Sequence, residues 1–311
     1  MHYTLHQLEI FFKISQLKSI TKAAEELNLT QPAVSIQLKK FQDQFPLPLT
    51  EYLGRKIHIT EFGKEIADTA ENILEQVATI TYKSAAYEGK IAGKLNISVV
   101  STGKYVMPYF LSDFLKKYPG IDLTMNVTNK SEVIKSIEDN TVDFAMVSVL
   151  PDHLKISRIE LMRNELFLLG KDNPSKSGMQ MSTQEFKKLK LIYREKGSAT
   201  RQAMESFLDQ QKFTNHKKIE LVSNEAVKQA VIAGLGYSIM PIIGIKNELK
   251  NKEVQIIPIK NLPIITNWNL IWLSSKKQSP AALALAQYVK ENKIEIIKKH
   301  FSWMESKSFL P

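Results

Sequence analysis

Residues 19–45 read SITKAAEELNLTQPAVSIQLKKFQDQF and hold two short helical patterns separated by a sharp break. The first pattern places Ala23 and Ala24 on its apolar face, where larger side chains would keep a crossing helix away. Thr30 is a suitable N-cap for the second helix, and Pro32 lies in its first turn, where proline is tolerated. Two short helices joined by a tight turn predict a helix-turn-helix.

The second of these helices has one apolar and one polar face. Val34 and Leu38 face inward, and the opposite side holds polar residues. Of these, Gln31 and Ser35 are able to hydrogen-bond base edges or phosphates, and Lys39 is able to reach a phosphate. The residues by themselves fit equally well a three-helix cap whose polar face is only solvated.

The flanking segments complete a small N-terminal head. A helix that precedes the helix-turn-helix has Leu5, Leu8, Phe12 and Ser15 on one face, with Phe11 beside them. Residues 55–60 alternate like a strand, and Arg55 and Lys56 would make this strand a basic wing beside the second helix.

Residues 60–88 contain no proline and predict one long helix. Its apolar and small residues recur at heptad spacing: Phe62, Ile66, Ala70, Ile73, Val77, Ile80, Ser84 and Tyr87. At 1.5 Å per residue the helix would extend roughly 40 Å, too far for the small head to cover it. The regular, narrow seam favours pairing with the same helix of a second chain over packing onto the chain's own body.

From residue 93 onward, β-strand and helix patterns alternate. Strands are expected near residues 95–100, 123–127, 143–147, 189–193, 219–222 and 268–273. Such alternation predicts α/β layers with largely parallel sheets, arranged here as two lobes joined by a double crossover. Open sheets of this kind bind ligands at the carboxyl ends of their strands.

Small hydroxyl or amide residues open a helix at four of these strand ends. Such positions combine free backbone N–H groups with a side-chain donor and favour an anion, although each residue also suits a plain helix cap. Lys104, Arg194 and Arg201 are able to add positive charge. If these strand ends converge on one cleft between the lobes, they form a site for a small anion. The candidate effector-binding residues are Ser101, Thr102, Asn129, Ser131, Ser148, Ser198, Thr200, Arg201 and Asn224.

Composition excludes several classes of protein. The 311 residues are 43% hydrophobic and 24% charged, which is ordinary for globular domains. The absence of cysteine excludes disulfides, cysteine-ligated metal sites and a thiol nucleophile. The net charge is +10, yet residues 1–58 hold only seven Lys/Arg against five Asp/Glu, so any nucleic acid there would meet a few placed groups. Neither a membrane span nor a secretory signal is visible, and we expect a cytoplasmic protein.

Catalytic motifs are missing from the sequence. It contains neither a G-x-S-x-G nucleophile elbow nor a P-loop, and Gly234-Leu235-Gly236 is an isolated G-x-G typical of a turn. His2 and His6 have metal-compatible spacing but no third ligand, so we interpret them as surface residues. No enzyme activity, metal or cofactor is expected.

Three motifs carry a specific family resemblance. The chain has Ala-Ala-x-x-Leu at 23–27, Gln-Pro-Ala-Val-Ser at 31–35 and Thr-x-x-Gly at 60–63. In this series it resembles the LysR-type transcriptional regulators, and the following heptad helix and two-lobed body extend the resemblance over nearly the whole chain. Residues 127–130 and 193–201 look most like the regulators of carbon-fixation operons, which sense phosphorylated or carboxylated sugars and acids.

The resemblance implies a DNA-binding regulator. Such proteins have a winged helix-turn-helix, a linker helix that pairs in a dimer, and an effector domain like a periplasmic binding protein. They are typically tetramers that bend double-stranded promoter DNA and act with RNA polymerase, under control of a metabolite between the lobes. On that pattern the DNA-binding residues are Gln31, Pro32 and Ser35 in the major groove, Thr30 and Lys39 near phosphates, and Arg55 and Lys56 at the wing. The residue after Ser35, often basic or polar in the family, is here Ile36.

We therefore expect an all-α winged helix-turn-helix head at 1–59, a linker and dimerisation helix at 60–90, and a two-lobed α/β effector-binding domain at 91–311. Lobe I would hold about 91–161 and 268–305, and lobe II about 162–267. The expected function is sequence-specific regulation of transcription at a dyad-symmetric promoter site, switched by a small carboxylate or phosphorylated metabolite. The alternative is a cytoplasmic small-molecule-binding protein or enzyme whose N-terminal helices serve only oligomerisation.

Overall fold

The computed structural model of the chain describes residues 3–54, 56–87, 90–174, 180–213 and 218–304. The chain divides into two compact units, Met1–Gly89 and Lys90–Pro311. Each unit has its own hydrophobic core. Among the described residues, no helix combines the length and the apolar composition that crossing a membrane requires.

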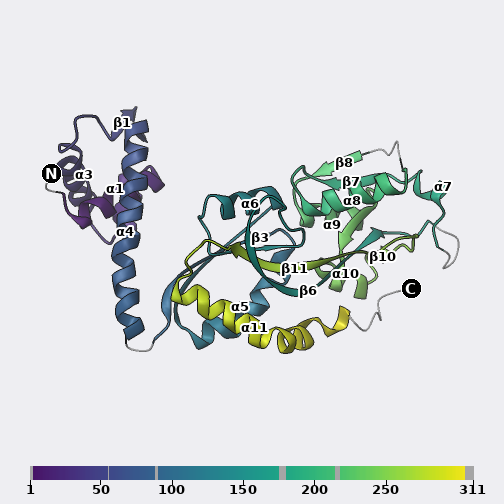
Figure 1. Cartoon of the computed structure of the whole chain (residues 1–311). Coiled ribbons are helices and arrows are strands. Elements are labelled where there is room, and N and C mark those ends of the chain that lie inside the picture. The colour runs from purple at the N-terminus through teal and green to yellow at the C-terminus, as the bar shows by residue number, and fades with distance from the viewer. Residues whose placement is uncertain (1–2, 55, 88–89, 175–179, 214–217, 305–311) are drawn as a thin grey trace. The chain divides into compact units, whose positions relative to one another are not determined.

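The first unit is the predicted winged helix-turn-helix followed by a long helix (Figure 1). Its elements are α1 (Leu5–Leu17), α2 (Ile20–Glu26), α3 (Gln31–Gln42), β1 (Thr50–Leu53), β2 (Lys56–Ile59) and α4 (Glu61–Tyr87). Thr30 caps α3 through its side-chain oxygen, as the sequence predicts, and Ser19 caps α2 in the same way. Ala23 and Ala24 are buried in the shared core, so α2 approaches its neighbours closely.

The apolar face expected for α1 is only partly confirmed. Leu5 is 48% exposed, whereas Leu8, Phe11 and Ile14 are buried. The helix carries more apolar residues than one face can hold, and the packing of Phe11 against Phe41 of α3 selects the inner side. Leu5, in the first turn, is left at the surface.

The wing is a hairpin of two strands rather than the single strand expected at 55–60. β1 pairs antiparallel with β2, from Thr50 opposite Ile59 to Leu53 opposite Lys56. Gly54, at a positive φ of 65°, occupies the tight turn between the strands, a conformation that glycine adopts without steric cost. Arg55 lies outside the described residues.

Thr60 and Gly63 join the wing to α4. The Thr60 hydroxyl donates to the carbonyl of Pro48 at 2.7 Å and accepts the backbone N–H of Gly63 at 2.9 Å. A Cβ at Gly63 would collide with the carbonyl oxygen of Leu49. The Thr-x-x-Gly motif therefore has a packing reason, since only glycine leaves room for this chain crossing.

The predicted heptad seam of α4 has two different environments. Ala67 and Ala70 are buried against the head, with Phe62, Ile66 and Ile73 packed beside them. Further along, Val77 is exposed and Ile80 is 68% exposed. The head therefore does not cover Val77 and Ile80 of the seam.

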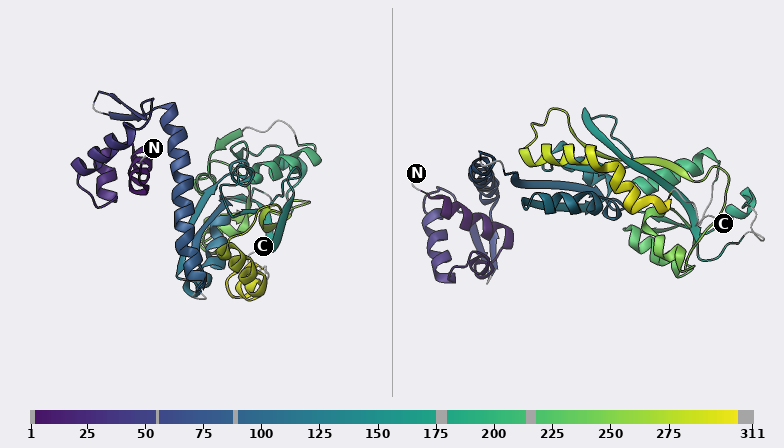
Figure 2. Two further views of the ribbon diagram at one scale, coloured as in Figure 1. Left: turned by 60° about the vertical axis from the view of Figure 1, so that its left-hand side comes forward. Right: turned by 90° about the horizontal axis from the view of Figure 1, so that it is seen from below.

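The second unit contains a mixed sheet with helices on both faces (Figures 1 and 2). Its strands are β3 (Ala92–Val100), β4 (Gly120–Thr128), β5 (Phe144–Val147), β6 (Ile156–Gly170), β7 (Leu191–Arg194), β8 (Lys218–Leu221), β9 (Ser238–Pro241), β10 (Gln255–Ile256) and β11 (Ile264–Leu273). Its helices are η1 (Gly103–Tyr105), α5 (Met107–Lys117), α6 (Lys130–Glu138), α7 (Thr183–Phe186), α8 (Ala199–Gln210), α9 (Asn224–Ile232), η2 (Ile242–Gly244), α10 (Lys246–Lys250), α11 (Pro280–Phe301) and η3 (Ser302–Met304).

Strand directions differ from the largely parallel sheet expected. β3 is parallel to β4 and β5, and β7 is parallel to β8. The pairs β6–β11, β5–β11, β6–β9 and β6–β10 are antiparallel. The difference arises because β6 and β11 are the crossovers, and they run through the sheet in opposite directions beside each other.

We call the part around β3, β4 and β5 lobe I and the part around β7, β8 and β9 lobe II. In lobe I, α5 and α11 lie side by side on one face of the sheet and α6 covers the other (Figures 1 and 2). Lobe II has a second core of buried aromatic and aliphatic residues, including Phe186, Tyr193 and Phe207. The expected lobe boundaries, near 161 and 268, fall inside the continuous strands β6 and β11 and stay a prediction.

We predict that Gly63→Ala destabilises only the first unit, by about 2 kcal/mol, because the added methyl group must push the Leu49 carbonyl away. Tryptophan occurs only at 268, 272 and 303, so its fluorescence reports on the second unit alone, while circular dichroism reports on both units. Urea unfolding should show a lower dichroism midpoint and an unchanged fluorescence midpoint. Glu61→Ala, at an exposed position of the same turn, is the control. An unchanged dichroism midpoint in the glycine variant would contradict the steric explanation.

Candidate functional site

The polar face of α3 presents the residues predicted to contact DNA. Gln31 donates from Nε2 to the hydroxyl of Ser35 at 3.1 Å, which joins two candidate base-contacting side chains. Pro32 and Lys39 are exposed, opposite the buried Val34, Leu38 and Phe41. This surface of α3 is solvent-facing and polar apart from Pro32 and one isoleucine.

The remaining candidates on the head have distinct positions. The Thr30 hydroxyl accepts the N–H of Ala33 and caps α3. Lys56 is exposed at the start of β2, and within the described residues neither it nor Lys39 has a carboxylate partner. Arg55 is not among the described residues, so its predicted contact is not placed.

Two residues that sequence reasoning missed hold α3 in position. The side chain of Gln42 accepts the backbone N–H and the hydroxyl of Thr50, at 3.2 and 2.8 Å, and so ties α3 to the wing. Gln7 of α1 donates to Gln37 of α3 at 3.1 Å. Neither glutamine has a local sequence pattern that marks it, because its partner lies on another element.

In the second unit, the structure brings the N-termini of α6 and α8 together across the lobes. The backbone N–H of Ser131 donates to the carbonyl of Gly197 at 3.2 Å. Asn129 and Ser198 cap the two helices with their side chains. A cavity of about 890 Å³ opens here, and its lining includes Lys130, Ser131, Lys196, Ser198, Arg201 and Gln202.

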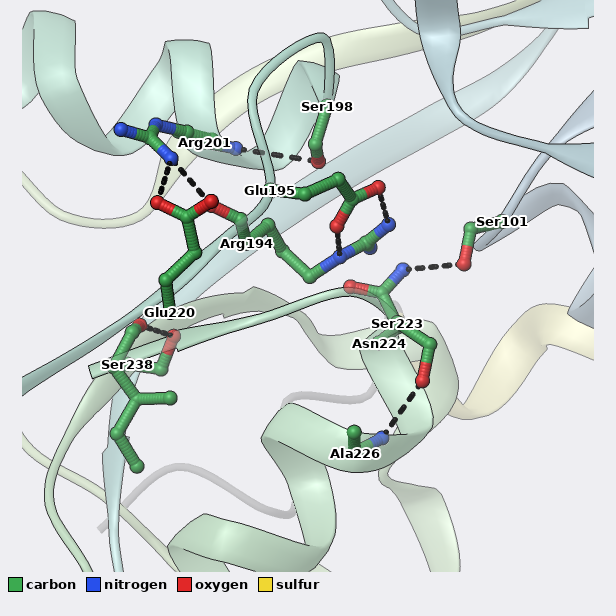
Figure 3. Close-up of polar contacts among 11 residues, drawn as sticks. Ser101, Arg194, Glu195, Ser198, Arg201, Glu220, Ser223, Asn224, Ala226 and Ser238 are labelled. Atoms are coloured by element: carbon green, nitrogen blue, oxygen red, sulfur yellow. Dashed lines mark hydrogen bonds and ion pairs between the residues drawn. The ribbon is translucent and has the colours of Figure 1, made fainter.

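The other two predicted strand ends meet each other rather than this cavity. Asn224, at the start of α9, donates to the Ser101 hydroxyl at 3.4 Å, and Ser223 caps α9 (Figure 3). Thr102 and Asn224 are buried, and the Asn224 Oδ1 has no hydrogen-bond partner in the described part of the chain. The nine candidates therefore fall into separate groups around the cleft.

Figure 3 shows the Arg194–Glu195 ion pair between Ser198 and the Asn224–Ser101 hydrogen bond. Arg194, only 3% exposed, binds both carboxylate oxygens of Glu195 through Nε and Nη2, at 2.7 and 2.8 Å. A bidentate pair of this kind satisfies a buried guanidinium. The charge predicted at Arg194 is thus already neutralised by the next residue.

Arg201 is also engaged within the protein. It pairs with Glu205 at 2.8 Å and Glu220 at 2.6 Å, and it donates to the carbonyl of Arg194 at 3.0 Å. Burial lowers the pKa of Arg201, but the bonds to Glu220 and Glu205 outweigh this and raise its pKa above the ordinary value. Arg201 borders the cavity while it braces α8 against β7 and β8.

Lys130 is a further cation at the cavity, and the sequence did not mark it as a candidate. Its ammonium lines the cavity and donates to the side chain of Gln202 at 3.1 Å across the lobes. Burial lowers the pKa of Lys130 and the carboxylate of Asp152, which also lines the cavity, opposes this in part, although the described residues show no ion pair with Lys130. Its charge is therefore open to an anion, together with that of the exposed Lys196.

Three further residues that the sequence marked as candidates are Ser148, Thr200 and Lys104. Ser148 is half-buried just after β5, and Thr200 is buried in the first turn of α8. Lys104 does not reach the cleft: it lies over the ring of Tyr105 at 5.0 Å and lines another cavity with Tyr109 and Trp303. In the described residues, no group of three or more His, Asp or Glu side chains is placed to hold a metal ion.

Two protein-family models match the chain. A bacterial regulatory helix-turn-helix protein of the lysR family matches residues 5–64, and a LysR substrate binding domain matches residues 88–293. The HTH-type transcriptional activator CmpR of Synechocystis is 33% identical over 92% of this chain and 94% of its own. A RuBisCO operon transcriptional regulator of Allochromatium vinosum is 33% identical over 93% of this chain and 96% of its own.

Solved structures match both units. The Synechocystis CcmR regulatory domain in complex with 2-PG has a TM-score of 0.61 and 29% identity, over 65% of this chain and 97% of that one. Full-length CbnR complexed with its target DNA has a TM-score of 0.70 over 93% of this chain and 99% of that one. At 18% identity, CbnR supports the fold alone.

We predict that Arg201→Gln lowers the free energy of unfolding of the second unit by about 1–2 kcal/mol, because Arg201 is 12% exposed while its carboxylate partners are about half exposed. Urea unfolding followed by tryptophan fluorescence measures this. Arg158→Gln, at an exposed arginine of the same unit, should change stability by less than about 0.5 kcal/mol. Equal effects of the two substitutions would show that the Arg201 contacts contribute no stability.

Proposed function

The chain belongs to the LysR family of DNA-binding transcriptional regulators, and from that premise we propose how it contacts DNA and what class of molecule controls it. It is a regulator and not an enzyme: both units match the family, and relatives that share its whole length are named transcriptional regulators. The alternative of a small-molecule-binding protein or enzyme whose N-terminal helices serve only oligomerisation is thereby discarded.

We propose that α3 enters the major groove of a dyad-symmetric promoter site. Gln31, Pro32 and Ser35 would face base edges. Thr30 and Lys39 would lie near phosphates, with Arg55 and Lys56 at the wing. The observation that carries this proposal is the exposed polar face of α3, opposite its buried apolar side, within the segment that matches the family's helix-turn-helix.

Pairing of two chains through α4 is part of the same proposal. A dyad-symmetric site needs two heads, and Val77 and Ile80 leave an apolar strip exposed on the C-terminal half of α4. Association of two such dimers into a tetramer, and contact with RNA polymerase at the promoter, follow the family pattern.

We propose that the effector is a small carboxylate or phosphorylated metabolite bound between the lobes. Two helix N-termini meet at the cavity, and Lys130 and Lys196 add positive charge there; Asp152 acts on Lys130, but the described residues show no ion pair between them. The relative whose regulatory domain was solved with 2-PG supports this chemical class. The anion would bind near Lys130, Ser131 and Ser198, whereas Arg194 and Arg201 keep their internal carboxylates.

The DNA contacts are tested by fluorescence anisotropy with an operator selected from random double-stranded DNA, titrated over a range of salt concentrations. Lys39→Gln should weaken binding to all sequences and reduce the slope of log K against log salt by about 0.9 for each phosphate that the chain no longer neutralises. Lys290→Gln, which removes the same charge from an exposed position of α11, should leave the slope unchanged. Equal slopes for the two variants would refute the phosphate contact.

The effector site is tested by thermal unfolding with 2-phosphoglycolate, followed by tryptophan fluorescence. A ligand at one hundred times its Kd stabilises the native state by about 2.7 kcal/mol, which should raise Tm by several degrees. Lys130→Gln should remove most of this shift, because it removes the charge at the cavity. Lys135→Gln, on an exposed turn of the same helix outside that cavity, should retain it. A full rise in Tm in the Lys130 variant would show that the anion does not bind at the proposed site.

A further inference from the structure

Ile36 is the large hydrophobic residue of α3 that the head leaves uncovered. All residues of α3 are described, and its other large hydrophobic residues, Val34, Leu38 and Phe41, are buried. Ile36 is 54% exposed. Its aliphatic side chain therefore contributes little to the core of the head.

The place of Ile36 on the helix is specific. Residues three and four apart are neighbours on a helix surface, so Ile36 lies beside Pro32 in one direction and Lys39 and Lys40 in the other. It directly follows Ser35, whose hydroxyl accepts from Gln31. Ile36 thus lies within the face that the proposed function directs into the major groove.

An aliphatic side chain there has little choice of partner. It can neither donate nor accept a hydrogen bond, so it cannot satisfy the polar groups that line the groove. The C5 methyl group of thymine is the apolar feature among the base edges of the major groove. We propose that Ile36 contacts the C5 methyl of a thymine in each half-site and thereby selects a T·A pair at that position.

This inference rests on the proposed docking of α3, and it adds base preference to it. Cytosine has no C5 methyl and presents an amino donor to the groove, so the contact disfavours a C·G pair. Methylation of cytosine at C5 supplies the missing methyl group. The contact of Ile36 is therefore testable in the DNA alone, by removing the methyl group of thymine or by adding one to cytosine.

The experiment uses the full-length chain and an operator selected from random double-stranded DNA. Each thymine of the operator is replaced in turn by deoxyuridine, in both half-sites symmetrically, which removes only the methyl group. Removing one buried methyl weakens binding about threefold to fourfold per half-site, so Kd should rise roughly tenfold when both are removed. We expect this at one symmetric position.

Three variants assign the methyl contact to Ile36. Ile36→Ala should bind the thymine and deoxyuridine operators equally well at that position. Ile36→Val should retain part of the discrimination, because it keeps most of the apolar surface. Ile294→Ala, the same substitution at a 75% exposed position of α11, should discriminate as the unchanged chain does. At the same position, 5-methylcytosine should bind more tightly than cytosine with the unchanged chain and with Ile294→Ala, but not with Ile36→Ala.

Different failures have different meanings. If the chain selects no sequence from the random pool, the proposed DNA reading fails, and with it the premise of this inference. If it selects an operator but deoxyuridine has no effect at any position, or if Ile36→Ala keeps the full discrimination, then the Ile36 contact alone is refuted. A change in oligomeric state on Ile36→Ala, measured by sedimentation, would assign the exposed side chain to a protein contact and overturn the proposal.

Discussion

The antiparallel pairing of β6 with β11 is the constraint on which the second unit depends. The ladder runs from Ile156 opposite Leu273 to Leu166 opposite Ile264 and passes through both lobes. Backbone hydrogen bonds fix its register, so the lobes face each other in one arrangement. The contact of Ser131 with Gly197 follows from that arrangement, and so does the cavity beside it. The position of the cleft is therefore set by the pairing of β6 with β11 rather than by the residues that line it.

The cationic side chains around this cleft differ in whether a carboxylate of the protein already binds them. An unpaired buried guanidinium is costly, and Arg194 and Arg201 accordingly hold carboxylates of Glu195, Glu205 and Glu220. Within the described part of the chain, Lys130 forms no ion pair and donates a hydrogen bond to the neutral amide of Gln202 on the other lobe. An anion bound there would interact with groups of both lobes, which is how ligand binding couples to the relative position of two lobes.

In the head, the residues that hold α3 in place are different from those on its exposed surface. Gln7 and Gln42 hold α3 through side-chain hydrogen bonds, and the collision expected at Gly63 shows how tightly the wing and α4 pass each other. These groups face inward or sideways and leave the outer side of α3 free. The surface that remains is polar, with Ile36 as its aliphatic exception.

Local patterns were enough to predict the short helices of the head, the cap at Thr30 and the alternation of strands and helices, because each depends on residues close together in the chain. The family motifs at 23–35 and 60–63 extended this to function. Packing between distant segments decided the rest. The inner face of α1, the strand β1, the mixed directions of the sheet and the neutralisation of Arg194 and Arg201 all depend on such partners. Periodicity along one segment does not report which distant residue will lie beside it.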